Sequence, residues 1–187
     1  CGYGEILKHS IIGNKKFYNF LNSHKNKILK LTSPFLEKAI HESCKIKKAV
    51  VQKDEKEKGL RKILNFGHSF AHAYEATLGF SKKLNHGEAV ILGMKTALNF
   101  SLKTKFMNKK EYYSIIDHID NSDLPSSVSK FFSPKDVNRI ISFMAKDKKN
   151  ISNNINLVLL KKIGTPVINK EYPKKKIGLF LKIFLRN

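Results

Sequence analysis

The sequence is poor in cysteine and arginine, and it has no long apolar run. Two cysteines among 187 residues are too few for a disulfide framework. The N-terminal segment lacks the pattern of a secretory signal, so a reducing cytoplasm is the expected compartment. No stretch of about 18 apolar residues occurs, which argues against a membrane-spanning helix. We expect a cytoplasmic protein in which Cys44 is a small buried side chain.

The scarcity of arginine also limits what the charge can mean. The formal net charge is +21, but only three of the 36 basic residues are arginine. Lysine is scattered through every segment, with few of the arginine–aromatic clusters that bind nucleic acid. We interpret the charge as a compositional bias of solvated lysines, to which a site for an anionic small molecule adds a little. Neither nucleic acid nor a membrane is an expected partner.

Most of the chain has apolar residues at three- and four-residue spacing, which predicts helix. Ser33 before Pro34, and Ser133 before Pro134, are typical of an N-cap followed by proline at the first helical position. With 41% hydrophobic residues, the composition supports one packed domain over residues 1–187. The expected helices are residues 5–12, 15–31, 34–52, 60–78, 88–104, 109–119 and 133–145.

The last part of the chain contains the one clear strand pattern. Residues 155–160 are rich in β-formers, and Gly164 ends the run, so we expect a short strand or hairpin near 155–168. The tail, residues 174–187, mixes lysine with large apolar residues. It fits either a basic amphipathic helix on a membrane or a terminal helix packed on the domain, and we prefer the second. The predicted fold class is mainly α.

The segment 60–78 carries an unusual polar stripe. At about 100° per residue, five polar side chains fall within about 80° of arc: Arg61, Asn65, His68, His72 and Glu75. An ordinary solvent-facing stripe in this chain would consist mostly of lysine and glutamate. Arginine suits carboxylate or phosphate, and histidine ligates metals or moves protons. The stripe therefore indicates a functional site, and Glu75 is interpreted as capping it rather than as binding metal.

The histidines allow more than one metal site. His68 and His72 have the i, i+4 spacing with which one helix can hold zinc through two imidazoles. Alternatively, only one of them binds metal, and His86, in a polar break before Gly87, completes the site. Spacing alone does not choose between these arrangements. Because no glutamate directly follows His68, the metalloprotease His-Glu-x-x-His pattern is excluded.

Several segments together resemble the 3-dehydroquinate synthases, which are cyclases of the shikimate pathway. The central segment 59–75, GLRKILNFGHSFAHAYE, is similar to the central helix of that family. The similarity continues in the same order over nearly the whole chain. The other matching segments are 4–9 (GEILKH), 43–51 (SCKIKKAVV) with the acidic residues that follow it, 84–90 (LNHGEAV), 147–149 (DKK) and 157–164 (LVLLKKIG).

The resemblance implies a zinc site, or a cobalt site, formed by Glu5, His68 and His86. It makes His72 a residue on the substrate side instead of a ligand. Three protein ligands with an open position are what a catalytic zinc needs. The implied reaction is transient NAD-dependent oxidation of a phosphorylated keto sugar acid, phosphate elimination, reduction and aldol closure. It yields 3-dehydroquinate and phosphate.

The resemblance also assigns roles to basic and polar residues. Lys8 and Lys47 match the substrate lysines of the family, and Lys148, beside another lysine, matches a further one. Arg61 and Asn65 are expected to bind the carboxylate or the ring hydroxyls of the substrate. His72 is expected to assist proton transfer near the phosphate, and Glu57 matches an acidic residue near the site.

The chain departs from the family pattern in two ways. Ala71 stands where the family often has glycine. No Gly-x-Gly-x-x-Gly loop occurs, so the N-terminal Rossmann-like domain that binds NAD in the family has no counterpart here. We expect the numbering to start inside a longer protein, whose full-length form is a homodimer. The resemblance implies that the C-terminal helical domain alone is inactive.

Two other functions remain open from the sequence. The first is another enzyme of the same superfamily, either a different sugar phosphate cyclase or a metal-dependent alcohol or glycerol dehydrogenase. Arg61 together with Asn65 favours a substrate that carries a carboxylate, and so favours dehydroquinate synthase. The second is a non-enzymatic basic protein that binds nucleic acid or membrane, for which zinc would have no role.

Overall fold

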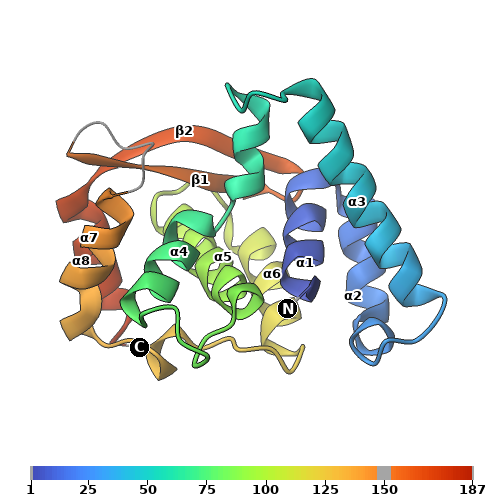
Figure 1. Cartoon of the computed structure of the whole chain (residues 1–187), viewed down its shortest axis with the longest axis horizontal. Helices are drawn as coiled ribbons and strands as arrows, with labels where there is room; N and C mark the ends of the chain where they lie inside the picture. The colour runs from blue at the N-terminus through green and yellow to red at the C-terminus, as the bar shows by residue number, and fades with distance from the viewer. Residues whose placement is uncertain (1, 147–152, 187) are drawn as a thin grey trace.

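The computed structural model describes residues 2–146 and 153–186, and most of them are helical. A β-hairpin lies across one end of the helices, with α1 to α3 on one side and α7 and α8 on the other (Figure 1). The α-helices are α1 (Gly2–Gly13), α2 (Lys15–Leu29), α3 (Phe35–Lys53), α4 (His68–Thr77), α5 (His86–Lys103), α6 (Lys109–Asp120), α7 (Val137–Ala145) and α8 (Lys174–Phe184). The 3-10 helices are η1 (Leu60–Asn65), η2 (Val128–Lys130) and η3 (Pro134–Asp136), and the strands are β1 (Asn154–Lys162) and β2 (Thr165–Pro173).

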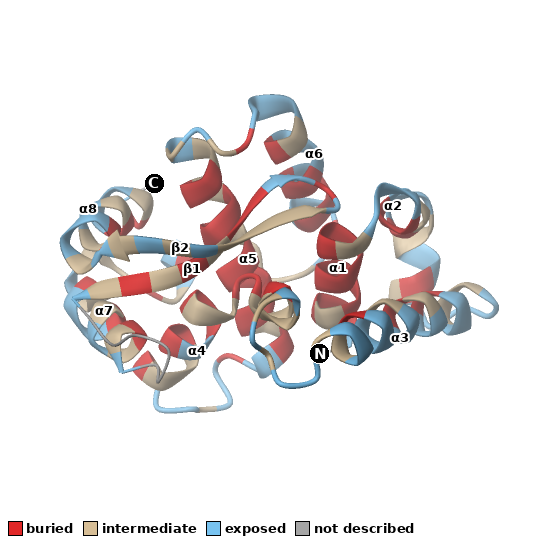
Figure 2. Cartoon of the chain, turned by 90° about the horizontal axis from the view of Figure 1, so that it is seen from above, coloured by how far each residue is buried: buried red, intermediate tan, exposed pale blue. Residues whose placement is uncertain are grey.

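Helix α5 forms the centre of the domain. Its sequence is apolar on nearly every face, and Figure 2 shows it as a mostly buried helix with other elements around it. It packs against α1, α4, α6 and β1. Its first turn is stabilised by Glu88, whose side chain accepts a hydrogen bond of 2.9 Å from the backbone N–H of Asn85. This cap fixes the start of α5 at His86.

The hairpin covers α5 with the inner face of β1. Ile155, Leu157 and Leu159 alternate along β1 and are all buried, which is the two-residue period of a half-buried strand. The turn contains Gly164, whose φ of +78° favours glycine. The predicted strand at 155–160 is confirmed. The pairing extends to Pro173, beyond the predicted limit of 168.

The predicted continuous helix 60–78 is wrong. The segment forms η1, a break at Phe66 and Gly67, and then α4. Gly67 has φ of +79°, a left-handed conformation that interrupts the α-helical path. The rotation of 100° per residue therefore does not extend across Gly67. Only His68, His72 and Glu75 belong to one regular helical face, whereas Arg61 and Asn65 reach the site from η1.

Three smaller predictions also need correction. Helix α3 starts at Phe35, with Pro34 at the cap and no capping side chain, so Ser33 does not cap it. Helix α2 ends at Leu29, two residues earlier than predicted. Cys44 is exposed, because it lies on the outer face of α3 rather than on the face that packs against α1 and α2. By contrast, Ser133 caps η3 as predicted.

The tail forms α8, which packs on the domain, as in the preferred interpretation. Ile177 and Leu181 are fully buried, and Leu185 directly after the helix is 4% exposed. These residues recur every four positions, which gives the helix one inward face, against α7 and β2. Among the helices that the structure describes, none has the length and apolar character needed to cross a membrane.

Candidate metal centre

Three side chains from three helices meet at one point. Glu5 comes from α1, and His68 and His86 are the first residues of α4 and α5. One possible ligand atom from each lies within 4.8 Å of the other two. Figure 1 shows the three helices packed side by side, in agreement with their contacts. The segments are far apart in the sequence, so the cluster exists only in the folded chain.

Glycines allow the three helices to approach so closely. Gly4 and Gly67 directly precede two of the clustered residues, and Gly87 directly follows the third. A Cβ atom at Gly4 would lie 2.6 Å from the carbonyl oxygen of Gly87, and one at Gly67 would lie 2.7 Å from the backbone nitrogen of Met94. A Cβ atom at Gly93 would lie 2.3 Å from the oxygen of Gly67. Larger residues would therefore separate the helices that carry the cluster.

Glu5 uses its two carboxylate oxygens differently. Oε2 accepts a hydrogen bond of 2.7 Å from Nζ of Lys8, which is 3% exposed. Oε1 is buried, accepts no hydrogen bond, and lies 3.5 Å from Nε2 of His68. Burial acts to raise the pKa of Glu5, but the charge and hydrogen bond of Lys8, together with His68 and His9, outweigh it and the pKa is lowered. The result is an ionised carboxylate with one oxygen directed at His68, and a metal ion would supply the missing partner.

His68 is held in its neutral form. Burial, followed by the positive charge of Lys8, lowers its pKa to about 4. Its Nδ1 lies 3.3 Å from the carbonyl oxygen of Phe66, which favours a proton on Nδ1. Nε2 then carries a free lone pair on the side of Glu5. A neutral imidazole in this orientation is suited to bind a metal.

His86 is the most exposed of the three, with half of its side chain open to solvent. Its Nδ1 lies 3.0 Å from Oε1 of Glu75, a residue of α4. Together the cluster offers one carboxylate oxygen and two imidazole nitrogens, a donor set that suits zinc or cobalt. His72 does not join this group among the described residues, although its ring centroid is 5.3 Å from that of His68.

A small cavity adjoins the cluster. Its volume is about 220 Å³, and it is polar and basic. Four of the predicted substrate residues line it, together with Glu5 and His68 of the cluster. The lining comprises Glu5, Lys8, His9, Lys47, Glu57, Arg61, Leu64, Asn65 and His68. The structure therefore brings together residues from α1, α3 and η1 that the resemblance places near one substrate.

A loop between α3 and η1 orients two of these residues. Asp54 accepts hydrogen bonds from the backbone N–H groups of Lys58, Gly59 and Arg61, at 2.8 to 2.9 Å. These backbone hydrogen bonds lower the pKa of Asp54. On the same loop, Glu57 accepts a hydrogen bond of 2.7 Å from the side-chain amide of Asn65. Asp54 therefore gives this loop its shape.

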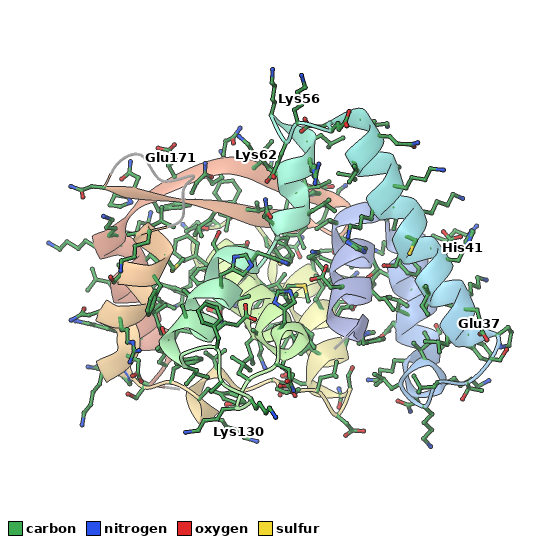
Figure 3. All side chains as sticks on the ribbon, viewed as in Figure 1. Glu37, His41, Lys56, Lys62, Lys130 and Glu171 are labelled. Carbon is green, nitrogen blue, oxygen red and sulfur yellow. The ribbon has the colours of Figure 1, made fainter. Side chains whose placement is uncertain are left out.

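A larger cavity of about 820 Å³ lies on the other side of His68. His72 lines it, together with Asn65 and Ser69. The hairpin forms part of the wall through Asn156 and Asn169. In Figure 3, Lys62 extends from η1 toward the hairpin, where its Nζ donates a hydrogen bond of 3.2 Å to Asn169. This volume is sufficient for a phosphorylated sugar acid.

The predicted substrate residues differ in exposure. Lys8 is buried, and burial lowers its pKa, although Glu5 acts in the opposite direction. Lys47 is exposed at the rim of the small cavity. Arg61 donates a hydrogen bond to the carbonyl oxygen of Glu55. Lys148, the remaining prediction, lies outside the described residues.

His9, to which the sequence analysis assigned no role, also lines the small cavity. Its Nδ1 lies 2.7 Å from Oγ of Ser43, and its Nε2 is 3.9 Å from Oε2 of Glu5. The i, i+4 spacing of Glu5 and His9 was the available sequence signal. His41 is exposed on α3 (Figure 3). His118 is buried against Tyr3, in a structural role.

Most of the chain is similar to one known protein family. Residues 2–150 match the family model for the 3-dehydroquinate synthase C-terminal domain. The 3-dehydroquinate synthase of Pelagibacter ubique is 62% identical over 182 residues, which cover 97% of this chain and 50% of that protein. That of Bradyrhizobium diazoefficiens is 35% identical over 187 residues, 97% of this chain and 49% of that protein. The chain thus spans about half the length of the curated relatives it matches.

Solved structures show the same fold. The 2-epi-5-epi-valiolone synthase of Streptomyces hygroscopicus, with NAD+ and Zn2+ bound, matches with a TM-score of 0.82 at 20% identity and covers 99% of this chain and 50% of that one. A 2-deoxy-scyllo-inosose synthase, complexed with carbaglucose-6-phosphate, NAD+ and Co2+, matches with a TM-score of 0.79 at 21% identity and covers 97% and 50%. From the family match and these relatives, we conclude that the chain belongs to the 3-dehydroquinate synthase family.

Proposed function

We propose that residues 1–187 form the metal- and substrate-binding domain of a 3-dehydroquinate synthase. The enzyme would convert 3-deoxy-D-arabino-heptulosonate 7-phosphate to 3-dehydroquinate and phosphate, in the shikimate pathway. The observation that carries the proposal is the convergence of Glu5, His68 and His86 beside a cavity lined by basic residues. The 62% identity to a 3-dehydroquinate synthase supports the same reaction.

The proposed ligands of zinc, or of cobalt, are Glu5 Oε1 and the Nε2 atoms of His68 and His86. Glu5 Oε1 is buried without a hydrogen bond, which is the state expected of a carboxylate oxygen that has a metal as its partner. When bound, the metal supplies Lewis acidity toward a substrate oxygen, and NAD supplies reversible hydride acceptance. The solved relatives that bind NAD+ together with Zn2+ or Co2+ support both assignments.

The basic residues of the small cavity would bind the anionic substrate. We assign Lys8 and Lys47 to its oxygens, and Arg61 to its carboxylate through the planar guanidinium. Asn65 would orient a ring hydroxyl, because its amide is already fixed by Glu57. The low exposure of Lys8 strengthens its attraction to an anion, since the surroundings screen the charge less than water does. Lys148 remains a proposal from the family resemblance alone.

His72 would move a proton at the substrate phosphate. It is exposed, and it lines the larger cavity beside His68 without belonging to the metal group. A histidine at this position can accept a proton from the substrate and return it. An N-terminal domain would bind NAD and close the cavities from the other side. We further propose that the full-length protein is a cytoplasmic homodimer.

The proposal can be tested by supplying an N-terminal half. The N-terminal half of the Pelagibacter ubique enzyme, joined to this chain, should release phosphate from the heptulosonate phosphate in the presence of NAD+ and zinc. Glucose 6-phosphate, which has no carboxylate, should react far more slowly. Arg61→Ala should lower kcat/KM by about 10- to 100-fold, from the loss of a charged hydrogen bond.

The matched control is Glu37→Ala, on the exposed face of α3 far from the cavities (Figure 3). It should leave kcat/KM unchanged. If glucose 6-phosphate reacts as fast as the heptulosonate phosphate, the substrate assignment is wrong. If Arg61→Ala behaves like Glu37→Ala, the role given to Arg61 must be abandoned.

A further inference from the structure

Each proposed metal ligand has one polar atom held by a neighbour and another left for the metal. For Glu5 the held atom is Oε2, which Lys8 contacts at 2.7 Å. For His68 it is Nδ1, 3.3 Å from a backbone carbonyl oxygen. For His86 it is also Nδ1, and its partner is the carboxylate of Glu75 at 3.0 Å. Glu75 is thus the partner that orients the third ligand.

His86 needs such a partner more than His68 does. Its side chain is 51% exposed, compared with 13% for His68, so packing restricts its rotamer less. Glu75 lies on α4 with its side chain only 13% exposed, and it reaches His86 across the contact between the two helices. A well-packed carboxylate therefore holds a poorly packed imidazole.

We propose that Glu75 is a positioning residue for the metal centre. By accepting a hydrogen bond from the Nδ1–H group, Glu75 selects the tautomer of His86 in which Nε2 has a free lone pair, and it turns that atom toward Glu5 and His68. Glu75 itself is not a ligand, because it does not belong to the described group whose atoms converge. This inference rests on the proposed metal centre and adds to it the residue that orients its most exposed member.

An alternative is that the contact only joins α4 to α5. The contact involves a half-exposed histidine, and exposed ion pairs contribute little to stability. The two helices are already joined by extensive packing, and α4 contains fully buried residues such as Tyr74. A purely structural contact would therefore change stability slightly and leave zinc affinity unchanged.

The test measures zinc affinity by competition with a chelator, on the full chain and on its fusion to the Pelagibacter ubique N-terminal half. Glu75→Ala should weaken zinc binding about 10- to 100-fold, as is usual for the loss of a partner that orients a ligand. Glu75→Gln keeps a hydrogen-bond acceptor and should lose less. Glu37→Ala removes the same charge from a remote surface and should change nothing. With cobalt in place of zinc, the visible absorption bands of Glu75→Ala should shift.

A double-mutant cycle separates the possible outcomes. In the His86→Ala background, Glu75→Ala should cause no further loss of zinc affinity, because Glu75 acts through His86. An equal loss in both backgrounds, or no loss with His86 present, would overturn the inference. Other results would reject the proposed metal centre itself. These are that the wild-type chain and its fusion bind no zinc, or that His86→Ala binds zinc as tightly as wild type. Melting of the metal-free variants shows whether each one folds.

Discussion

Replacing Gly67 by alanine tests how the fold builds the metal centre. Gly67 has φ of +79° and lies between η1 and α4, directly before His68. Its substitution should introduce two separate costs. The first is the left-handed backbone, which an alanine adopts at a cost of about 1–2 kcal/mol. The second is steric, because the new methyl group would lie 2.7 Å from the backbone nitrogen and 2.8 Å from Cγ of Met94.

The two costs can be measured separately, because Gly79 is a matched control. Gly79 also has a left-handed backbone, with φ of +67°, but an added methyl group there would meet nothing within 4 Å. Gly79→Ala should therefore cost only the backbone contribution, about 1–2 kcal/mol. Gly67→Ala should cost a further 1–3 kcal/mol from overpacking, about 2–5 kcal/mol in total.

Urea unfolding of the metal-free chain gives the free energy of unfolding of both variants. The loss for Gly67→Ala should exceed that for Gly79→Ala by at least about 1 kcal/mol. Zinc affinity should also fall for Gly67→Ala, because the methyl group displaces the start of α4 and with it His68. Equal losses of stability would refute the claim that close packing at Gly67 positions the cluster.

Three further predictions concern the buried polar groups and the metal. Tyr74→Phe removes a buried hydrogen bond of 2.8 Å to Thr96, and urea unfolding should show a loss of about 1–2 kcal/mol. Burial lowers the pKa of His118 from 6.5 to about 4, so the folded chain keeps it neutral while the unfolded chain protonates it below pH 6.5. The contribution of neutral His118 to the free energy of unfolding is therefore complete above pH 6.5. It is lost as the pH falls toward 4, by up to about 3 kcal/mol. Urea unfolding at several pH values should show a smaller loss of stability at low pH for His118→Gln. If the stability of this variant depended on pH as that of wild type does, the role given to His118 would be wrong. Zinc at about 100 times its Kd should raise the free energy of unfolding by about 2.7 kcal/mol, and thermal melting of His86→Ala should show little of this increase.

Much of the fold could be predicted from periodicity. The apolar run that starts after Glu88 predicted a buried helix, and α5 is that helix, although it begins two residues earlier, at His86. The sequence of the tail also favoured a helix packed on the domain, as α8 is. The full length of strand β2 was not predicted, because it has no buried residue and its exposed Asn169 and Glu171 obscure the pattern of a strand. Its place is set by pairing with β1, which no local pattern records.

The break in the central segment shows why the site was harder to predict. A single glycine in a helical pattern is usually tolerated, so Gly67 did not predict an interruption. The close approach of Met94 from α5 leaves no room for a side chain at Gly67, and this contact joins segments that are distant in the sequence. Glu5, His68 and His86 likewise come together only in the tertiary structure, and only the family resemblance suggested that they would. The i, i+4 pair of His68 and His72 was the local signal, and His72 lies outside the group.

The most direct test of the metal centre is the zinc content of purified variants, measured on the fusion that contains the Pelagibacter ubique N-terminal half. Wild type should contain one zinc ion per chain. Glu5→Ala, His68→Ala and His86→Ala should each lose it, whereas His72→Ala should retain it. Loss of zinc from His72→Ala with retention in His86→Ala would contradict the account, and would assign the metal to the two histidines of α4 instead.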